Sequence, residues 1–224
     1  TEFDYNVESF ADIQILRYKV DGFDELSLKQ KTFIYYLNEA ALWGRDILFD
    51  QNGRYNLEIR RMLEDFYQNY KGDREDKNFK GVEEYLKRVW FSNGIHHHYG
   101  SDKFVPKFDR QWFVEQTKCS EEIAEVIFNP EVMPKKISLA EGVDLLLASA
   151  CNYYQGVTQE EAEAFYAEMK AKGDQTHPVM YGMNSTLVKG KDGKIYEDVW
   201  KVGGKYGKAI SKIVENLKLA RPFA

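Results

Sequence analysis

Three consecutive histidines, His96, His97 and His98, are the residues of this sequence that most readily suggest chemistry. A zinc site needs three or four ligands that converge on one point, whereas consecutive side chains point in different directions. The other histidine, His177, lies far along the chain, and no His-Glu-X-X-His helix motif is present. We therefore predict no metal site in this chain, and we interpret the triplet as part of a loop that is either structural or faces a substrate.

Other patterns that carry chemistry are missing or have simpler explanations. The sequence has no Gly-X-Ser-X-Gly elbow, Walker A loop or Gly-X-Gly-X-X-Gly run, and Cys119 and Cys151 lie outside any recognisable protease motif. The run Gly203–Gly207 favours a turn that leads into a helix over an anion site at the helix start. Adjacent glutamates such as Glu160 and Glu161 do not face each other on a helix, which favours solvated faces or helix-dipole partners. We predict no catalytic residue in this chain.

Composition and charge exclude several kinds of partner. With 31 Lys+Arg against 36 Asp+Glu, the 224-residue chain has a net charge of −5 and no general attraction for nucleic acid or an anionic membrane. Charged residues interrupt the apolar stretches, so no membrane span is predicted. Residues 113–171 carry 4 bases and 11 acids, and residues 186–221 carry 9 bases and 4 acids, which we interpret as two solvated surfaces.

The location and the oligomeric state stay open. The first residue is Thr1 rather than Met, and no apolar signal region follows it. We expect any targeting segment to have been lost, which leaves both a cytoplasmic and a periplasmic location possible.

Helical periodicity dominates the elements that must position these residues. Apolar residues recur at helical spacing in three long stretches, which predicts helices from Ser27 to Asn52, from Ile59 to Tyr70 and from Phe79 to Trp90. Each stretch ends near a glycine, a common residue at helix C-caps. Three helices joined by such short turns predict an antiparallel bundle.

Shorter patterns fill the rest of the chain. Further helices are predicted over residues 109–117, 121–128, 138–150, 158–172 and 205–220, and the fourth of these starts at a capping-box pattern, Thr158-Gln-Glu-Glu161. A strand is predicted from Ile13 to Val20, closed by a turn at Asp21-Gly22, and Asp192-Gly193 predicts a hairpin within residues 187–202. The predicted fold is mostly α, of the α+β class: a multi-helix bundle with a small β-hairpin or β-barrel component.

The stretch from Ser92 to Phe108 is the best candidate for a binding site. It has no clear period, it is long for a loop inside a bundle, and it is rich in aromatic and imidazole groups. Binding residues concentrate on loops that rigid elements hold in place. Aromatic residues make up 15% of the whole chain, which predicts an aromatic core or groove.

The same loop resembles a segment of the dipeptidyl peptidase III family. From Val89 to Pro106 the sequence reads Val-Trp-Phe-Ser-Asn-Gly-Ile-His-His-His-Tyr-Gly-Ser-Asp-Lys-Phe-Val-Pro, which is similar to the family's Tyr-Ser-Asn, Gly-Asn-Tyr and Phe-Gly-Asp-Thr-Lys-Phe-Val-Pro elements. Leu28–Asp46, Asn152–Ala162 and Tyr206–Ala220 resemble other segments of the family, in the same order. The resemblance extends over nearly the whole chain and is closest to the bacterial, Bacteroides-type members.

The resemblance implies a two-lobed zinc exopeptidase that releases dipeptides from the N-termini of oligopeptides. In that family a His-Glu-X-X-Gly-His helix, or its six-residue variant, and a later glutamate hold zinc on the upper lobe, and the glutamate of the motif is the general base. None of these residues is in this chain. The chain, residues 1–224, therefore resembles the N-terminal part of the lower lobe, which surrounds a small β-barrel and supplies one wall of the substrate cleft. Zinc is expected in the full-length enzyme and not in this chain, which is expected to be inactive alone.

The resemblance also points to candidate substrate-binding residues. Tyr99 falls on the aromatic position that lines the pocket for the N-terminal side of the substrate, and Asn93 and His97 are further candidates. For Asn93 a role in the turn comes first. Some members have Phe in place of this tyrosine, and others have Asn, Tyr and Lys in place of the three histidines. The pocket is thus expected to be more polar and more sensitive to pH.

Two other interpretations stay open. The chain is alternatively a stand-alone α-helical module that binds peptides or proteins without catalysis. A reading frame that continues past Ala224 into a His-Glu-X-X-Gly-His helix would separate the two. A third interpretation is a metal-binding histidine loop, for which the test is calorimetric titration with zinc before and after the substitution His97→Ala.

Overall fold

The computed structural model describes residues 3–224, and the chain divides into two compact units. One unit contains residues 3–44 together with residues 211–224, and the other contains Arg45–Ile210. Helices dominate, and the described strands form a two-stranded and a three-stranded sheet. The predicted mostly α, α+β class with a small β component is therefore confirmed. Among the described residues, no helix combines the length and the apolar character needed to span a membrane.

The first unit begins with a β-hairpin. β1 (Asn6–Phe10) pairs antiparallel with β2 (Ile13–Leu16), and Ala11 takes a left-handed conformation, φ 50°, in the turn between them. The predicted strand is confirmed from Ile13 to Leu16 and ends four residues before Val20. Its partner β1 was not predicted, because the acidic and aromatic residues of that stretch show no clear alternation.

The long helix α1 (Leu28–Trp43) follows a 3₁₀ turn, η1 (Phe23–Glu25), and its start is set by a capping box. The Ser27 hydroxyl accepts the Gln30 backbone N–H at 3.3 Å, and the Gln30 side-chain oxygen accepts the Ser27 N–H at 2.9 Å. The range predicted as helical from Ser27 to Asn52 is confirmed, but it forms two helices and not one continuous helix. Gly44 caps α1, and α2 (Arg45–Asn52) is a separate helix in the other unit. Glycine is the poorest helix former after proline, which accounts for the break.

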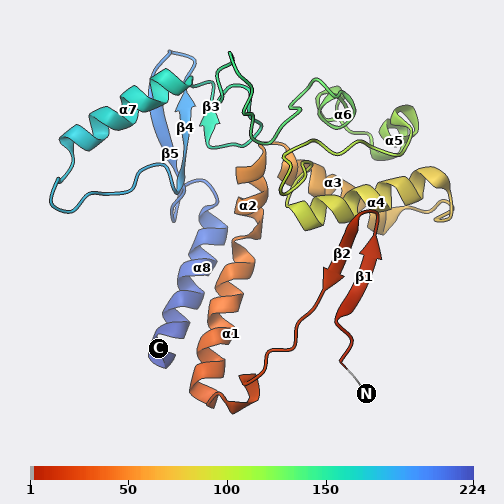
Figure 1. The fold of residues 1–224 in the computed structure, drawn as a ribbon, viewed down its shortest axis with the longest axis horizontal. Helices are drawn as coiled ribbons and strands as arrows, with labels where there is room; N and C mark the ends of the chain where they lie inside the picture. Colours follow the sequence, from red (N-terminus) through yellow and green to blue (C-terminus); the bar gives the residue numbers. More distant parts are fainter. Residues whose placement is uncertain (1–2) are drawn as a thin grey trace. The chain divides into compact units, whose positions relative to one another are not determined.

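The C-terminal residues of the chain complete the first unit. α8 (Gly207–Ala220) passes from the second unit into the first, and the part from Ser211 onward runs antiparallel to α1 (Figure 1). It ends in η2 (Arg221–Phe223), where the Phe223 ring stacks on Tyr36 with centroids 6.0 Å apart. The Lys29 ammonium donates to the carbonyl oxygen of Ala224 at 3.0 Å. Segments from the two ends of the sequence thus form one helical pair.

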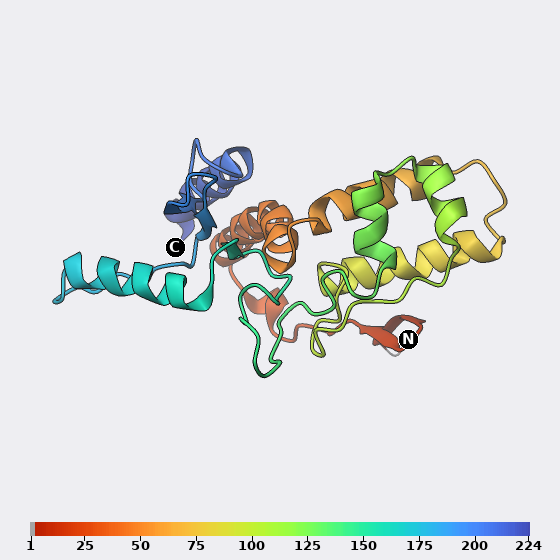
Figure 2. The same ribbon diagram turned by 90° about the horizontal axis from the view of Figure 1, so that it is seen from above.

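A four-helix layer forms the main body of the second unit. α3 (Asn56–Asn69) and α4 (Lys77–Ser92) lie antiparallel, and α5 (Arg110–Thr117) and α6 (Glu121–Phe128) lie across them (Figure 2). All four helices match predicted ranges within a few residues. The predicted antiparallel bundle of the first three helices is correct in part: α3 contacts α4 and also α2, the second half of the first predicted helix, but α1 belongs to the other unit.

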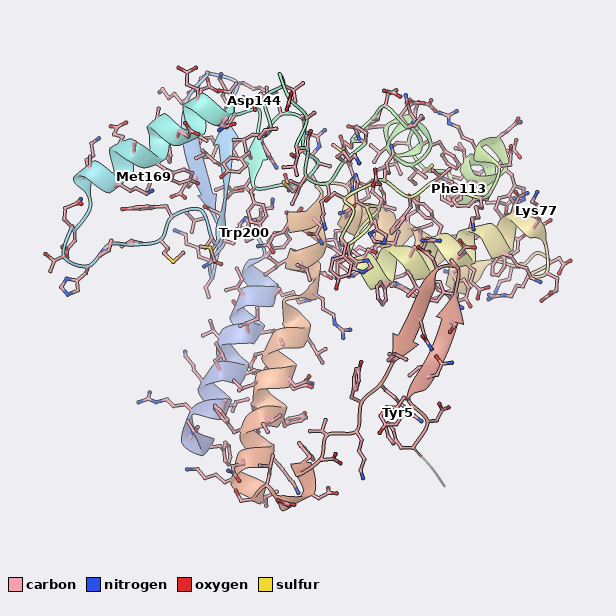
Figure 3. All side chains as sticks on the ribbon, in the orientation of Figure 1. Tyr5, Lys77, Phe113, Asp144, Met169 and Trp200 are labelled. Carbon is pink, nitrogen blue, oxygen red and sulfur yellow. The ribbon has the colours of Figure 1, made fainter. Side chains whose placement is uncertain are left out.

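The core of this layer is aromatic, as the composition predicted. Ile59, Leu63, Val82 and Phe113 are fully buried, and Phe113 lies among the side chains below α5 in Figure 3. Ring pairs extend through the core, with centroids 4.9 Å apart for Phe108 and Phe113. Each fully buried large apolar side chain contributes roughly 1.5–3 kcal/mol.

A smaller sheet and one helix form a further part of the second unit. β3 (Tyr154–Gln155) pairs parallel with β4 (Ser185–Lys189), and β4 pairs antiparallel with β5 (Ile195–Val199). The hairpin predicted at Asp192-Gly193 is confirmed, with Gly193 at φ 78°. β3 is too short for a sequence signal. α7 (Gln159–Lys172) starts at the predicted capping box, and Asp144 accepts the N–H of its first residue at 2.8 Å (Figure 3).

The helix predicted from Ser138 to Ala150 is wrong. The segment contains only isolated turns, and Gly142 has φ 75°, a left-handed conformation that a helix interior does not contain. The Asp144 carboxylate accepts the backbone N–H groups of Leu146 and Leu147, at 3.0 and 3.1 Å, and so closes a local turn. By contrast, the run Gly203–Gly207 is the predicted turn that leads into α8.

Candidate functional site

The candidate loop starts where α4 ends, and Asn93 is the residue that ends the helix. Asn93 has φ 54° and ψ 42°, a left-handed conformation that asparagine tolerates, and its N–H donates to the carbonyl oxygen of Val89. The buried Asn56 side chain accepts the Ile95 N–H at 3.2 Å. The Asn93 carbonyl oxygen accepts from the Asn52 amide at 3.1 Å. Asn93 therefore forms the turn that ends α4, as predicted.

Residues 97–102 form a tight hairpin, which we call the hairpin tip. The Phe104 N–H donates to the Ile95 carbonyl oxygen at 2.9 Å, and the His97 N–H donates to that of Asp102 at 2.7 Å. The Ser101 N–H closes the turn on the His97 carbonyl oxygen at 3.1 Å. Tyr99 lies in the middle of this turn, and 87% of its surface is exposed.

A distant segment of the chain supports the hairpin tip. The Lys103 N–H donates to the Pro134 carbonyl oxygen at 3.1 Å, and the Lys136 N–H donates to that of Ser101 at 2.8 Å. The Lys135 ammonium pairs with the Asp102 carboxylate. The tip is thus one part of a small backbone layer and not a free loop.

Lys103 ties this layer to the end of α6. Its ammonium donates to the carbonyl oxygens of Val126 at 3.0 Å, Asn129 at 2.5 Å and Val132 at 2.5 Å. These carbonyls lie at the C-terminal end of a helix, where a cation is favourable. Burial lowers the pKa of Lys103, and the carboxylates of Glu125 and Glu131 oppose that shift.

His96 points into the protein and is 2% exposed. Its Nε2 lies 2.8 Å from the Met133 carbonyl oxygen, so this nitrogen carries the hydrogen and donates it. Burial lowers the pKa of His96 to about 4, and the neighbouring Lys103 and Lys136 act in the same direction. At neutral pH His96 is therefore an uncharged structural residue, and its side chain does not face a substrate.

His97, His98 and Tyr99 form a stack of rings at the tip. The centroids of His97 and His98 are 4.5 Å apart with the rings 26° from parallel, and those of His98 and Tyr99 are 4.4 Å apart. Phe91 contacts His98 in an edge-to-face arrangement, with centroids 5.0 Å apart. The sequence predicted divergent side chains, which holds for His96 but not for the stacked pair. Within residues 3–224, no group of three or more His, Cys, Asp or Glu side chains is placed to hold a metal ion.

Two hollows flank the hairpin tip and meet at Val105, which is 81% exposed. The first, the basic hollow, has about 460 Å³ and is lined by Arg88, His97, Lys103 and Lys107 together with Asp102 and Phe104. The second, the apolar hollow, has about 440 Å³. Its lining is mostly apolar and includes Val105, Pro106, Phe128, Pro130 and Pro134, together with the charged Asp102, Lys103 and Lys135. The sequence reasoning missed the contribution of residues 128–135, since no local signal links that segment to the loop.

A buried polar cluster lies elsewhere in the second unit and was not predicted. The carboxylate of Asp50, on α2, accepts the Asn152 amide at 3.0 Å and lies 3.3 Å from the Lys205 ammonium. Tyr206 donates to the same carboxylate, and burial together with this hydrogen bond raises the pKa of Tyr206. The cluster connects α2 to the turn before α8, which assigns Lys205 to a structural role.

Comparison with known proteins leaves the family open. No family model matches this sequence, and no curated protein matches it. The resemblance to dipeptidyl peptidase III thus remains a hypothesis that rests on the residues themselves. Of the three candidate residues, Tyr99 and His97 lie together in the hairpin tip, and Asn93 lies at the helix end that leads into it.

Proposed function

We propose that this chain is the N-terminal part of the lower lobe of a dipeptidyl peptidase III-type zinc exopeptidase and supplies one wall of its substrate cleft. The observation that carries the proposal is Tyr99, a large aromatic side chain that is 87% exposed on a hairpin tip with a supported backbone. A ring held in this way offers apolar contact area at a low entropic cost of binding. The ordered resemblance of four segments supports the family.

Tyr99 is proposed to contact the side chain at the N-terminal side of a peptide. Its ring provides an apolar surface, and its hydroxyl provides a donor and an acceptor at the edge of that surface. The apolar hollow beside it offers room for a further apolar group of the peptide. In this proposal the chain binds and orients the substrate and performs no chemical step.

Zinc in the proposed enzyme belongs to residues outside this chain. Of the histidines in the loop, His96 is buried with Nε2 on a backbone carbonyl, and the Nδ1 of His97 accepts backbone N–H groups. These donor sets do not fit a zinc site.

The test uses the uninterrupted reading frame that contains these residues. We expect the longer protein to bind zinc stoichiometrically and to release dipeptides from a peptide substrate. In that protein, Tyr99→Ala should raise KM roughly tenfold, a loss of about 1.4 kcal/mol of binding, with a smaller effect on kcat. Tyr99→Phe keeps the apolar contact and should change KM much less.

The control is Tyr18→Ala, because Tyr18 is also exposed, at 74%, and belongs to the other unit. It should leave both constants unchanged. A reading frame that stops at Ala224, or a longer protein that binds no zinc and releases no dipeptide, contradicts the proposal.

The apolar hollow favours one second candidate, a stand-alone module that binds peptides. Its lining of prolines around Val105 and Phe128 is suited to an apolar peptide side chain without any catalytic partner. Micromolar binding of peptides by the isolated chain, together with a reading frame that stops at Ala224, would favour this module. Val105→Glu should then abolish the binding.

A further inference from the structure

The imidazole of His97 closes the turn that carries Tyr99. Its Nδ1 accepts the backbone N–H of Tyr99 at 3.2 Å and that of Gly100 at 2.9 Å. This is the geometry in which an asparagine or aspartate oxygen usually caps a turn, accepting N–H groups two and three residues later. Here a titratable ring takes the place of the amide or carboxylate.

The two hydrogen bonds fix the state of the ring. A nitrogen that accepts two N–H groups carries no hydrogen, so Nδ1 is bare and the hydrogen of the neutral ring is on Nε2. In the imidazolium both nitrogens are donors. Protonation of His97 would therefore place an N–H where two other N–H groups already point, and both hydrogen bonds would be lost.

We propose that His97 is a positioning residue for Tyr99, and that protonation of its imidazole opens the turn at residues 98–101 and so makes the placement of Tyr99 depend on pH. The backbone hydrogen bonds that join the hairpin to the supporting segment do not depend on the protonation of His97. The backbone bonds from Phe104 to Ile95 and from Lys103 to Pro134 involve no imidazole. The opening is thus confined to the tip.

The ring of His98 links the turn directly to Tyr99. It contacts both rings: it stacks on His97 with centroids 4.5 Å apart, and it packs against Tyr99 at 4.4 Å with the two rings tilted by 48°. Two imidazolium rings at 4.5 Å repel each other, so a charge on His97 opposes a charge on His98. Displacement of His97 removes the ring on which His98 stacks, and Tyr99 packs against His98.

Charged groups on several neighbouring elements influence this protonation. Asp102, across the turn, favours the charged ring, and its own pKa is lowered first by the Lys135 ammonium and also by His97. Cations oppose protonation of His97. Arg88, Lys103 and Lys107 line the basic hollow, where Arg88 and Lys107 both pair with Glu84. Lys135 and Lys136 lie in the supporting segment. While the ring is neutral, Nδ1 accepts both N–H groups and the turn is closed; once the ring is protonated by acidification, the turn opens.

The opening of the turn can be measured in this chain directly, and the measurement does not depend on enzymatic activity. The chain is labelled with ¹⁵N, and two readouts are recorded between pH 8 and pH 5.5. The first is the ¹⁵N shifts of the His97 ring, which report the tautomer directly. The second is the exchange protection of the Gly100 amide, corrected for the intrinsic effect of pH.

The expected result is a hydrogen on Nε2 and a bare Nδ1 at pH 8, and a fall of at least tenfold in Gly100 protection on acidification, in step with His97 protonation. His97→Asn is the matched variant, because its side-chain oxygen can accept the same two N–H groups and does not titrate. It should keep the protection at both pH values. His97→Ala should lack it at both.

Two results would overturn the inference: a hydrogen on Nδ1 of His97 at pH 8, or the same loss of Gly100 protection in His97→Asn as in the wild type. The tautomer measurement needs no variant, so it stands even where a substitution disturbs folding. The consequence for peptide binding rests on the proposed function. A pH-dependent turn in a protein that releases no dipeptides from peptides would support the inference and contradict that function alone.

Discussion

At the scale of single residues, His96 makes the stability of this protein depend on pH. The folded state holds the ring neutral with a pKa of about 4, whereas the ordinary value is 6.5. Between these values the unfolded chain binds a proton that the folded chain does not, so the free energy of unfolding rises with pH. The contribution of His96 is complete above about pH 6.5 and is lost as the pH falls towards 4. It amounts to on the order of 3 kcal/mol.

His96→Gln tests this prediction, since its side-chain amide can still donate to the Met133 carbonyl oxygen and does not titrate. Urea unfolding at several pH values should show a shallower pH dependence for the variant between pH 6.5 and 4. The matched control is His177→Gln, because the His177 side chain is 84% exposed. Equal slopes for the wild type and His96→Gln would contradict the prediction.

At the scale of elements, Lys103 joins the candidate loop to the end of α6. Its ammonium satisfies three carbonyl oxygens at once, and a methionine at this position would leave them without that donor. We expect Lys103→Met to lower the free energy of unfolding by roughly 2–3 kcal/mol, measured by urea denaturation. It should also speed amide exchange at Lys136, whose N–H donates to Ser101.

Lys107→Met is the matched control for this substitution. Lys107 lies in the same loop and pairs with Glu84 at the surface, where its side chain is 63% exposed. Exposed ion pairs contribute at most about 1 kcal/mol. A similar loss in both variants would mean that the bonds of Lys103 to α6 do not support the loop.

Local signals explain which elements the sequence predicted. Ser120 and Thr158 cap the first turns of α6 and α7 with their side chains, and regular apolar spacing follows Ser120 in α6. The segment 138–150 also has apolar residues at helical spacing, but Gly142 and the Asp144 turn override the periodicity. In this segment the residues that form turns, and not the spacing of apolar residues, determine the local structure.

At the scale of the whole molecule, the sequence predicted the loop but not what surrounds it. The helices, the loop and the exposed position of Tyr99 in it follow from local patterns or from the resemblance. The support from residues 133–136 and the cluster around Asp50 join segments that are far apart in the sequence, and no local pattern marks such pairs. The stacking of His97 on His98 was missed for a related reason, because it depends on the tight turn that the hairpin imposes.

The two units also differ in how much apolar surface they bury, and this should separate their stabilities. Among the described residues of the first unit, the buried apolar side chains are Ile13, Ala40 and Ala220, whereas Leu28 is 81% exposed. The second unit has the large aromatic core.

Native-state hydrogen exchange should therefore give α1 amides protection at least about 100-fold lower than the core amides of α3 and α4, a difference of about 2.7 kcal/mol. Phe223→Ala, which removes the stack on Tyr36, should lower protection in α1 and leave α3 and α4 unchanged. Equal protection in α1 and α4, or a loss in both on this substitution, would instead show that the two units unfold as one.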